Sequence, residues 1–217
     1  TRRSSDLSLN GILVDSYFRT LGAKRPYPGI ALLAFDSGPA WGGDVFLPAE
    51  ALALLISRIS AQKPRAIGLL ADLNEQHYSA ADLQRVVSAI DPAVPLFVGY
   101  LDEMGLDRPA PTVFGDRLTY SPGLVSRDSF NYGADSVSRR VMAQIDHVPT
   151  FYARLATFVR GSTPDRLESL SSSRHAFIRW QGGPGTYVTH SAWSLLSPAP
   201  PDLNLGGKIV LVGQVRR

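Results

Sequence analysis

Short apolar runs alternate with amphipathic segments through the first hundred residues. The apolar runs, at 29–35, 66–71 and 95–100, are bounded by Gly, Pro or Asp and are too short for typical helices. Such continuous runs are typical of strands that are buried on both faces of a parallel sheet. Between them, at 52–59 and 83–90, apolar residues recur every three or four positions, as on one face of a helix. This alternation predicts a parallel sheet that is covered by helices and joined by right-handed crossovers.

The residues at the ends of the amphipathic segments match helix-capping preferences. Pro48 suits the first turn of a helix, and Pro64 would stop the same helix. Ser79 and Asp82 have the spacing of a capping box. Earlier in the chain, 9–22 has apolar residues at helical spacing followed by a C-terminal glycine, which predicts an opening helix.

The second half of the chain has a less regular pattern. Prolines and glycines punctuate 101–136, where only one short strand, near 117–120, is predicted. Further on, the pattern predicts strands within 136–145, at 176–180 and at 207–213, a helix from Thr150 to Gly161, and a short helix at 191–196. The predicted fold class is therefore α/β: three layers with a mostly parallel sheet flanked by helices, and a more irregular C-terminal half that contains additional strands. No linker composition divides the chain, so 1–217 is expected to be one domain.

Composition excludes several classes of protein. The chain has 217 residues, of which 44% are hydrophobic and 19% charged, as in a folded globular protein. With 22 basic and 19 acidic side chains, the net charge of +3 is too small to indicate nucleic-acid binding. The chain has no Cys, which excludes disulfides, thiolate catalysis and Cys-ligated zinc. No apolar run reaches the roughly 20 residues of a membrane-spanning helix, and no signal peptide is visible.

Polar residues follow the predicted strands. Asp36 and Asp72 come directly after the first and second strands, and Tyr100 and Asp102 follow the third. Ligands of open α/β sheets bind at the carboxyl ends of the strands. Two neighbouring carboxylates there would accept a cation, an amine or a hydroxyl-bearing ligand. The alternative is that each carboxylate caps a nearby loop or helix N–H group.

Two further residues complete the predicted ligand site. Trp41 lies in a Gly-rich loop after the first strand and would form an apolar wall of the site, or else anchor that loop to the core. Arg139 and Arg140 are adjacent in a predicted strand, so they point to opposite faces. One of them would pair with a carboxylate or bind an anion, or else form a structural salt bridge. The candidate ligand-binding residues are Asp36, Trp41, Asp72, Tyr100, Asp102 and Arg140.

No catalytic residue, metal site or cofactor is predicted. None of the four His has a second His at zinc spacing, and the chain has neither an H-E-x-x-H nor a G-x-S-x-G motif. The glycines at 182–185 lack the Lys-Ser/Thr ending of a P-loop, and Pro184 removes an N–H group that a phosphate cradle needs. These glycines are predicted to form a structural turn.

The last third of the chain resembles a known family. In 177–187 a strand leads into the turn Gly182-Gly183-Pro184-Gly185-Thr186-Tyr187, a short helix follows at 191–196, and 207–213 reads Gly-Lys-Ile-Val-Leu-Val-Gly. This order is similar to the C-terminal part of the CHASE type-2 extracellular sensor domain. The resemblance continues upstream, since 9–22, 30–36, 65–72 and 131–158 are similar to the family's first helix, first two strands and later strand–helix unit. It covers a core of 9–213, although the stretch 41–48 lacks the Arg that the family usually carries there.

The resemblance implies a non-catalytic sensory module on the periplasmic or extracellular side of the bacterial inner membrane, excised from a longer receptor. It implies flanking transmembrane helices, a histidine kinase, nucleotide or diguanylate cyclase, or protein kinase output, and a homodimer whose contact is the first helix. The expected ligand is an unknown small molecule or ion, and no nucleic acid. Two alternatives remain at this point: a ligand-free dimerisation or assembly module, and a hydrolase that uses Asp36 and Asp72.

Overall fold

A six-stranded sheet, parallel throughout, forms the centre of the described structure. The computed structural model describes residues 20, 25–35, 47–71, 73–100, 111–122, 140–145, 148–161, 175–177 and 186–214. Within these residues the strands lie in the order β4-β3-β2-β10-β1-β9. The strands are β1 (Ile30–Phe35), β2 (Ala66–Leu70), β3 (Leu96–Tyr100), β4 (Thr119–Pro122), β9 (Thr189–Ser191) and β10 (Ile209–Gln214).

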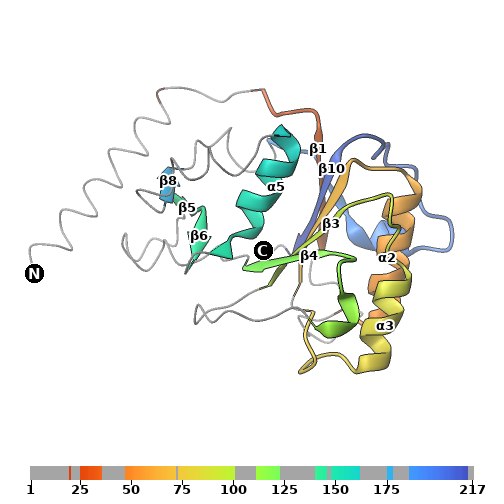
Figure 1. Cartoon of the computed structure of the whole chain (residues 1–217). Helices are drawn as coiled ribbons and strands as arrows, with labels where there is room; N and C mark the ends of the chain where they lie inside the picture. The colour runs from red at the N-terminus through yellow and green to blue at the C-terminus, as the bar shows by residue number, and fades with distance from the viewer. Residues whose placement is uncertain are drawn as a thin grey trace, which may run out of the picture.

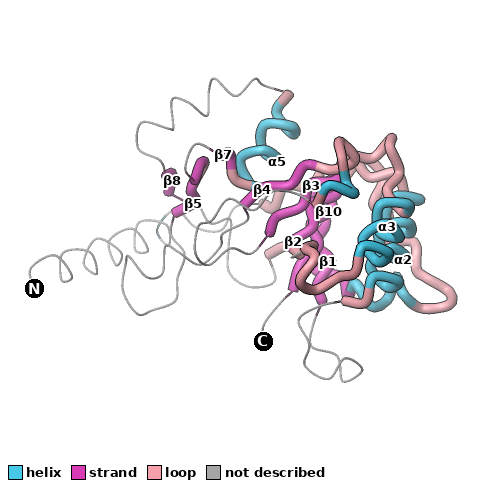
Figure 2. Tube along the Cα trace, turned by 60° about the horizontal axis from the view of Figure 1, so that its bottom comes forward, coloured by secondary structure: helices cyan, strands magenta, loops and turns pink. Residues whose placement is uncertain are grey.

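Helices cover both faces of this sheet, which confirms the predicted three-layer α/β fold. Helices α2 (Ala49–Ala61) and α3 (Ala80–Ser88) lie on one face, and α5 (Phe151–Arg160) lies on the other (Figure 1; Figure 2). The 3-10 turns η2 (Thr112–Phe114) and η3 (Ala192–Leu196) contribute to the α2–α3 layer. Two antiparallel pairs stand outside the main sheet: β5 (Arg140–Met142) with β8 (His175–Phe177), and β6 (Gln144–Ile145) with β7 (Val148–Pro149).

The central strands are buried on both faces, as their continuous apolar runs predicted. On β2, Ile67 and Leu69 pack into the larger core under α2 and α3, while Ala66 packs into the smaller core under α5. Residues on β3 alternate in the same way, with Val98 in the larger core and Phe97 in the smaller one. The period of two along each strand therefore feeds two separate hydrophobic clusters.

Two glycines create a flat place on the sheet for α5. Gly68 of β2 and Gly99 of β3 face α5, where the ring of Phe151 lies against both. A Cβ at Gly99 would come within 2.9 Å of Phe151 Cγ and 2.8 Å of Leu70 Cδ2. Because this spacing is shorter than van der Waals contact, α5 packs this closely only over residues without side chains.

The predicted helix caps are confirmed. The Ser79 hydroxyl accepts from the Asp82 N–H at 3.2 Å, and the Asp82 carboxylate accepts from the Ser79 N–H at 3.2 Å, which makes the capping box reciprocal. At α5, the Thr150 side chain accepts from the Ala153 N–H, and Gly161 ends the helix in a left-handed conformation with a φ of 61°. Helix α2 begins one residue after Pro48, which occupies the N-cap position rather than the first turn.

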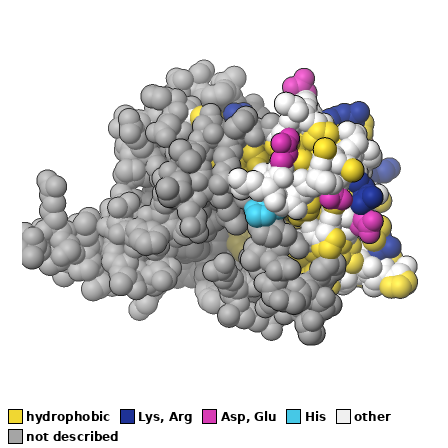
Figure 3. Space-filling view, turned by 90° about the horizontal axis from the view of Figure 1, so that it is seen from below, with side chains coloured by type: hydrophobic (Ala, Val, Ile, Leu, Met, Phe, Trp, Pro, Cys, Tyr) yellow, Lys and Arg dark blue, Asp and Glu magenta, His cyan; other side chains and the backbone are white. Residues whose placement is uncertain are grey.

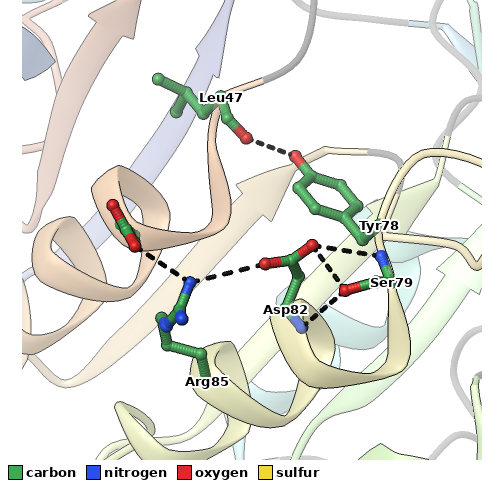
Figure 4. A network of polar contacts seen from close by, with 6 residues as sticks. Leu47, Tyr78, Ser79, Asp82 and Arg85 are labelled. Atoms are coloured by element: carbon green, nitrogen blue, oxygen red, sulfur yellow. Dashed lines mark hydrogen bonds and ion pairs between the residues drawn. The ribbon is translucent and has the colours of Figure 1, made fainter.

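Polar contacts tie the starts of α2 and α3 together (Figure 4). Arg85 of α3 forms ion pairs with Glu50 of α2 at 3.2 Å and with Asp82 at 3.5 Å. The Tyr78 hydroxyl donates to the carbonyl of Leu47 at 2.8 Å. The two helices therefore lie side by side, joined by residues that precede them and by an ion pair from the first turn of α2 to the last turn of α3.

The second half of the chain departs from its predicted pattern in three places. The predicted strand within 136–145 is divided into β5 and β6 by a bend at Ala143. Strand β9 was not predicted, because three residues at a sheet edge carry too little pattern. The predicted 191–196 helix is present as the 3-10 turn η3, which Arg58 of α2 holds by donating to the carbonyls of Leu195 and Ser197. The predicted opening helix lies outside the described residues except for Thr20, which is helical.

The close packing of Phe151 predicts the effect of a methyl group on β3. Gly99→Ala should lower the free energy of unfolding by about 1–3 kcal/mol, because its Cβ forces Phe151 and Leu70 aside in a packed core. Urea denaturation measures this change. Gly206→Ala is the matched control, since its Cβ would meet nothing closer than Gln62 O at 3.6 Å and should cost little. Equal stability of the Gly99→Ala variant and the parent protein would contradict the packing described.

The capping box predicts a pH dependence. The Ser79 hydroxyl, its backbone N–H and Arg85 hold the pKa of Asp82 below the ordinary value of 3.8. A depressed folded-state pKa stabilises the fold above the unfolded pKa, and the stabilisation is lost as pH falls through the folded value. The stability difference between the parent protein and Asp82→Asn should therefore persist at neutral pH and shrink below pH 3.8. Urea denaturation from neutral pH down through pH 3.8 tests this, and the pH-dependent part of the stability difference should diminish in a Ser79→Ala background.

Candidate functional site

The described helices begin at the same edge of the sheet. Helix α3 starts after β2 ends, and α2 lies on the crossover from the end of β1 to the start of β2. Phe151, at the start of α5, lies over Gly99 near the end of β3, whereas Phe158, near the helix end, packs on Phe97 with ring centroids 5.3 Å apart. All three helices thus direct their positive N-terminal ends towards the carboxyl ends of the strands, where open α/β sheets bind ligands.

Tyr100 is the predicted site residue that the structure describes most fully. It is the last residue of β3, and only 2% of its surface is exposed. Its ring stacks on that of Tyr120 of β4, with centroids 4.8 Å apart and an interplanar angle of 23°. Tyr100 is therefore part of the buried core near the ends of the strands and is not exposed at the edge of the sheet.

The remaining predicted residues are not placed by the structure. Asp36, Trp41, Asp72 and Asp102 lie outside the described residues. The backbone of Arg140 is described in β5, opposite Phe177 of β8, and its side chain is not. Arg140 therefore belongs to an antiparallel pair outside the main sheet.

The strand order separates the predicted ligand-binding residues into two groups. Strand β10 lies between β1 and β2, so the ends of these two strands are roughly 10 Å apart, twice the normal strand spacing. Asp36 and Trp41 follow β1 in the sequence, while Asp72 and Asp102 follow β2 and β3, which are paired neighbours. The strands that precede the two carboxylates Asp36 and Asp72 are therefore not neighbours.

Two polar residues that sequence reasoning missed lie at the carboxyl ends of β2 and β4. Asn74 comes shortly after β2, and Ser121 is the penultimate residue of β4. The Asn74 Nδ2 atom and the Ser121 Oγ atom are buried, and neither has a hydrogen-bond partner among the residues that the structure describes. An asparagine after a strand is an ordinary turn signal, and a serine in a four-residue strand gives no signal of function, so neither stood out.

The carboxyl ends of β2, β3 and β4 form a connected group. The Tyr120 hydroxyl donates to the carbonyl of Leu73 at 3.4 Å, which joins β4 to the loop after β2 across the end of β3. We call Asn74, Tyr100, Tyr120 and Ser121 the β3 corner. Its residues are aromatic or neutral and polar, so the corner is suited to hydrogen bonding and packing rather than to charge-driven catalysis.

Among the described residues, one titratable group near the carboxyl edge has a strongly shifted pKa. Burial raises the pKa of Tyr152, in the first turn of α5, to about 12, so its hydroxyl stays protonated at neutral pH. Within the residues that the structure describes, no group of three or more His, Asp or Glu side chains is placed to hold a metal ion. On the face shown in Figure 3, the basic and acidic side chains that are coloured are interspersed rather than gathered by sign.

The comparisons with known proteins give one match. A model of the CHASE2 domain family matches residues 2–216, which is nearly the whole chain. No curated protein and no solved structure matches. Among the helices of the described part of the chain, none is long and apolar enough to cross a membrane.

The β3 corner predicts a measurable role for one hydroxyl. Tyr120→Phe should lower the free energy of unfolding by about 0.5–1.5 kcal/mol, because it deletes the hydrogen bond to the Leu73 carbonyl and keeps the ring stack. Urea denaturation measures the change. Tyr27→Phe is the matched control, since Tyr27 is 54% exposed and its substitution should have little effect. Equal effects of the two variants would show that the contact does not hold the corner together.

Proposed function

This chain belongs to the CHASE2 family of extracytoplasmic sensor domains, and we propose that it detects a small molecule or ion at the carboxyl edge of its sheet. The observation that carries this proposal is the family match over residues 2–216. CHASE2 domains are sensory and non-catalytic, so the family does not support a hydrolase that uses Asp36 and Asp72. In this proposal, residues 1–217 act as one domain with its core at 9–213.

The fold supports the choice of the carboxyl edge. Three helix N-termini and the β3 corner lie at that edge, and in open parallel sheets ligands bind outside the carboxyl ends of the strands. The opposite edge receives the C-terminal ends of the same helices, where Arg65 donates to the carbonyl of Val159. The two edges therefore differ in the groups that they offer, because all three helices of the described residues present their free N–H groups at the carboxyl edge.

The position of β10 suggests how binding reaches the rest of a receptor. This strand runs to Gln214 and ends between β1 and β2, at the middle of the proposed ligand-binding edge. A ligand shifts a receptor only if it binds one arrangement more tightly than another. In this proposal, the ligand favours one position of the edge loops against the end of β10 and so biases the chain that follows it.

The proposal includes the setting of the domain. It places the domain on the periplasmic or extracellular side of a bacterial inner membrane, as a homodimer between flanking transmembrane helices. The output is a histidine kinase, a nucleotide or diguanylate cyclase, or a protein kinase. The extracytoplasmic side follows from the family, whereas the dimer, the output and the ligand are parts of the proposal.

A thermal-shift experiment on the 217-residue chain tests sensing. Cations, anions, amines, amino acids and neutral sugars are each titrated against the purified protein. At least one class should raise Tm progressively with concentration, since a ligand of the native state at 100 times its Kd adds about 2.7 kcal/mol of stability.

The control for this screen is the Gly206→Ala variant, whose Tm should rise by a similar increment because Gly206 lies before the start of β10, at the opposite edge of the sheet. A flat response of the parent protein across all classes would contradict ligand sensing and would favour a module that only dimerises or assembles.

A further inference from the structure

The first turn of α5 has two backbone donors without acceptors. An α-helix leaves its first four N–H groups without partners inside the helix. Here the Ala153 N–H donates to the Thr150 hydroxyl, and the Arg154 N–H donates to the Thr150 carbonyl at 3.0 Å. The N–H groups of Phe151 and Tyr152 have no acceptor among the residues that the structure describes. Because only 2% of the Phe151 surface is exposed, its N–H group is shielded from bulk water.

Ser121 supplies a third polar group without a partner, on the same face of the sheet. Only 1% of this residue is exposed, and its Oγ atom has no hydrogen-bond partner among the described residues. Ser121 of β4 pairs with Gly99 of β3, and paired residues of adjacent parallel strands point to the same face. Phe151 lies on the face to which Gly99 points, so the Ser121 side chain points to the α5 side of the sheet.

The Phe151 ring shows that α5 starts over β4. Its Cγ lies 2.9 Å from the Cβ position of Gly99, and its Cζ lies 2.9 Å from that of Gly68. The ring therefore points from β3 towards β2. Since Cβ, Cγ and Cζ of a phenylalanine are collinear, the backbone of Phe151 lies on the other side of Gly99, towards β4. Adjacent strands are roughly 4.8 Å apart, so Ser121 lies within about one side chain of this backbone.

The strand that precedes α5 agrees with this position. Strand β7 leads into the helix through Thr150, and β7 and α5 both contact β4 (Figure 2). The two free N–H groups and the Ser121 hydroxyl therefore lie together, at the carboxyl end of β4 and beneath the start of one helix. Unpaired polar groups in a folded core cost free energy, so a buried helix start with an unpaired hydroxyl beside it indicates a role in binding.

The groups at this position favour an anion. Two N–H groups donate only, and a hydroxyl can donate to the same ligand. The positive end of the helix adds to the attraction for negative charge. The first turn of α5 contains no acidic residue, and burial keeps the Tyr152 hydroxyl neutral by raising its pKa to about 12. Arg154, one turn into the helix, is exposed and forms no ion pair with the other described residues.

From these observations we propose that the start of α5 and Ser121 bind a small oxyanion, of the carboxylate, nitrate, sulfate or phosphate kind. The N–H groups of Phe151 and Tyr152 and the Ser121 hydroxyl donate to its oxygens. The inference rests on the proposed sensory function and specifies its ligand class and its place on the carboxyl edge. Since the ring of the same Phe151 packs on β3 and β2, an anion held at its N–H group fixes α5 against the sheet.

Isothermal titration calorimetry on the purified 217-residue chain tests this proposal. Sodium acetate, nitrate, sulfate and phosphate are titrated at constant ionic strength, with calcium chloride, spermidine and glucose as cationic and neutral probes. Ser121→Ala removes the hydroxyl, and Ser60→Ala is its matched control because Ser60 is a buried serine near the end of α2. Arg154→Gln removes a charge near the start of α5, and Arg160→Gln removes the same charge at the end of this helix.

The parent protein, Ser60→Ala and Arg160→Gln should bind at least one of the four oxyanions with equal affinity. Ser121→Ala should weaken that binding at least tenfold, because a hydrogen bond to a charged acceptor is lost. Arg154→Gln should weaken it about two- to fivefold, and less at high salt, because the charge is exposed and screened. Without ligand, Ser121→Ala should match or exceed the parent Tm, because it removes a buried polar group that is unpaired.

Three outcomes overturn the inference. Oxyanion binding that Ser121→Ala leaves unchanged would place the anion elsewhere, and a lower Tm of the ligand-free variant would then assign the hydroxyl to an ordered water. Saturable binding of calcium, spermidine or glucose alone would leave the sensory function standing and refute this ligand class. Binding of no probe would refute the oxyanion site, and the broader thermal-shift screen then decides whether the sensory function fails as well.

Discussion

The insertion of β10 between β1 and β2 is the constraint on which the rest of the structure depends. The register pairs Ile209–Gln214 with all six residues of β1 on one side and with β2 on the other. Strands β1 and β2 are not neighbours in the sheet. The crossover through α2 therefore passes over the position of β10, the last described strand. Contacts of such high sequence separation form slowly, because the long chain between the two strands must close first.

Strand β10 contributes side chains to the cores on both faces of the sheet. Val210 and Val212 of β10 extend the large core under α2 and α3, while Ile209 enters the small core with Phe151. The close packing of α5 against Gly68 and Gly99 places the first turn of this helix beside the end of β3. The geometry of the β3 corner therefore follows from glycines that carry no functional group of their own.

This arrangement suits a sensor. In the proposed mechanism, a molecule bound at the carboxyl edge acts on several chain segments at once, and one of those segments is the end of β10. A closely packed core beneath the edge resists local deformation, which favours transmission of a displacement. The family match covers nearly the whole chain, so the choice of the carboxyl edge rests on the fold and not on the family.

Much of the fold was predictable because its signals are local. The apolar runs of β1 to β3, the Ser79–Asp82 capping box and the Thr150 and Gly161 caps each depend on a few neighbouring residues. The family was likewise predicted from a local signal, the glycine-rich motif in the last third of the chain, and the family match confirms it. The candidate site was less predictable. Sequence reasoning selected Tyr100 from its position at the end of a strand, and its role in the site stays a prediction, while Asn74 and Ser121 gave no signal.

By itself, the sequence determined the strands β1 to β3 and β10, the helices α2, α3 and α5 with their caps, and the family to which the chain belongs. Only the tertiary structure decided that β10 separates β1 from β2, that Tyr100 is buried against Tyr120, and that Asn74 and Ser121 flank the same strand end. The reason is physical: capping and periodicity act between neighbouring residues, whereas strand order and burial depend on pairing between segments far apart in the chain.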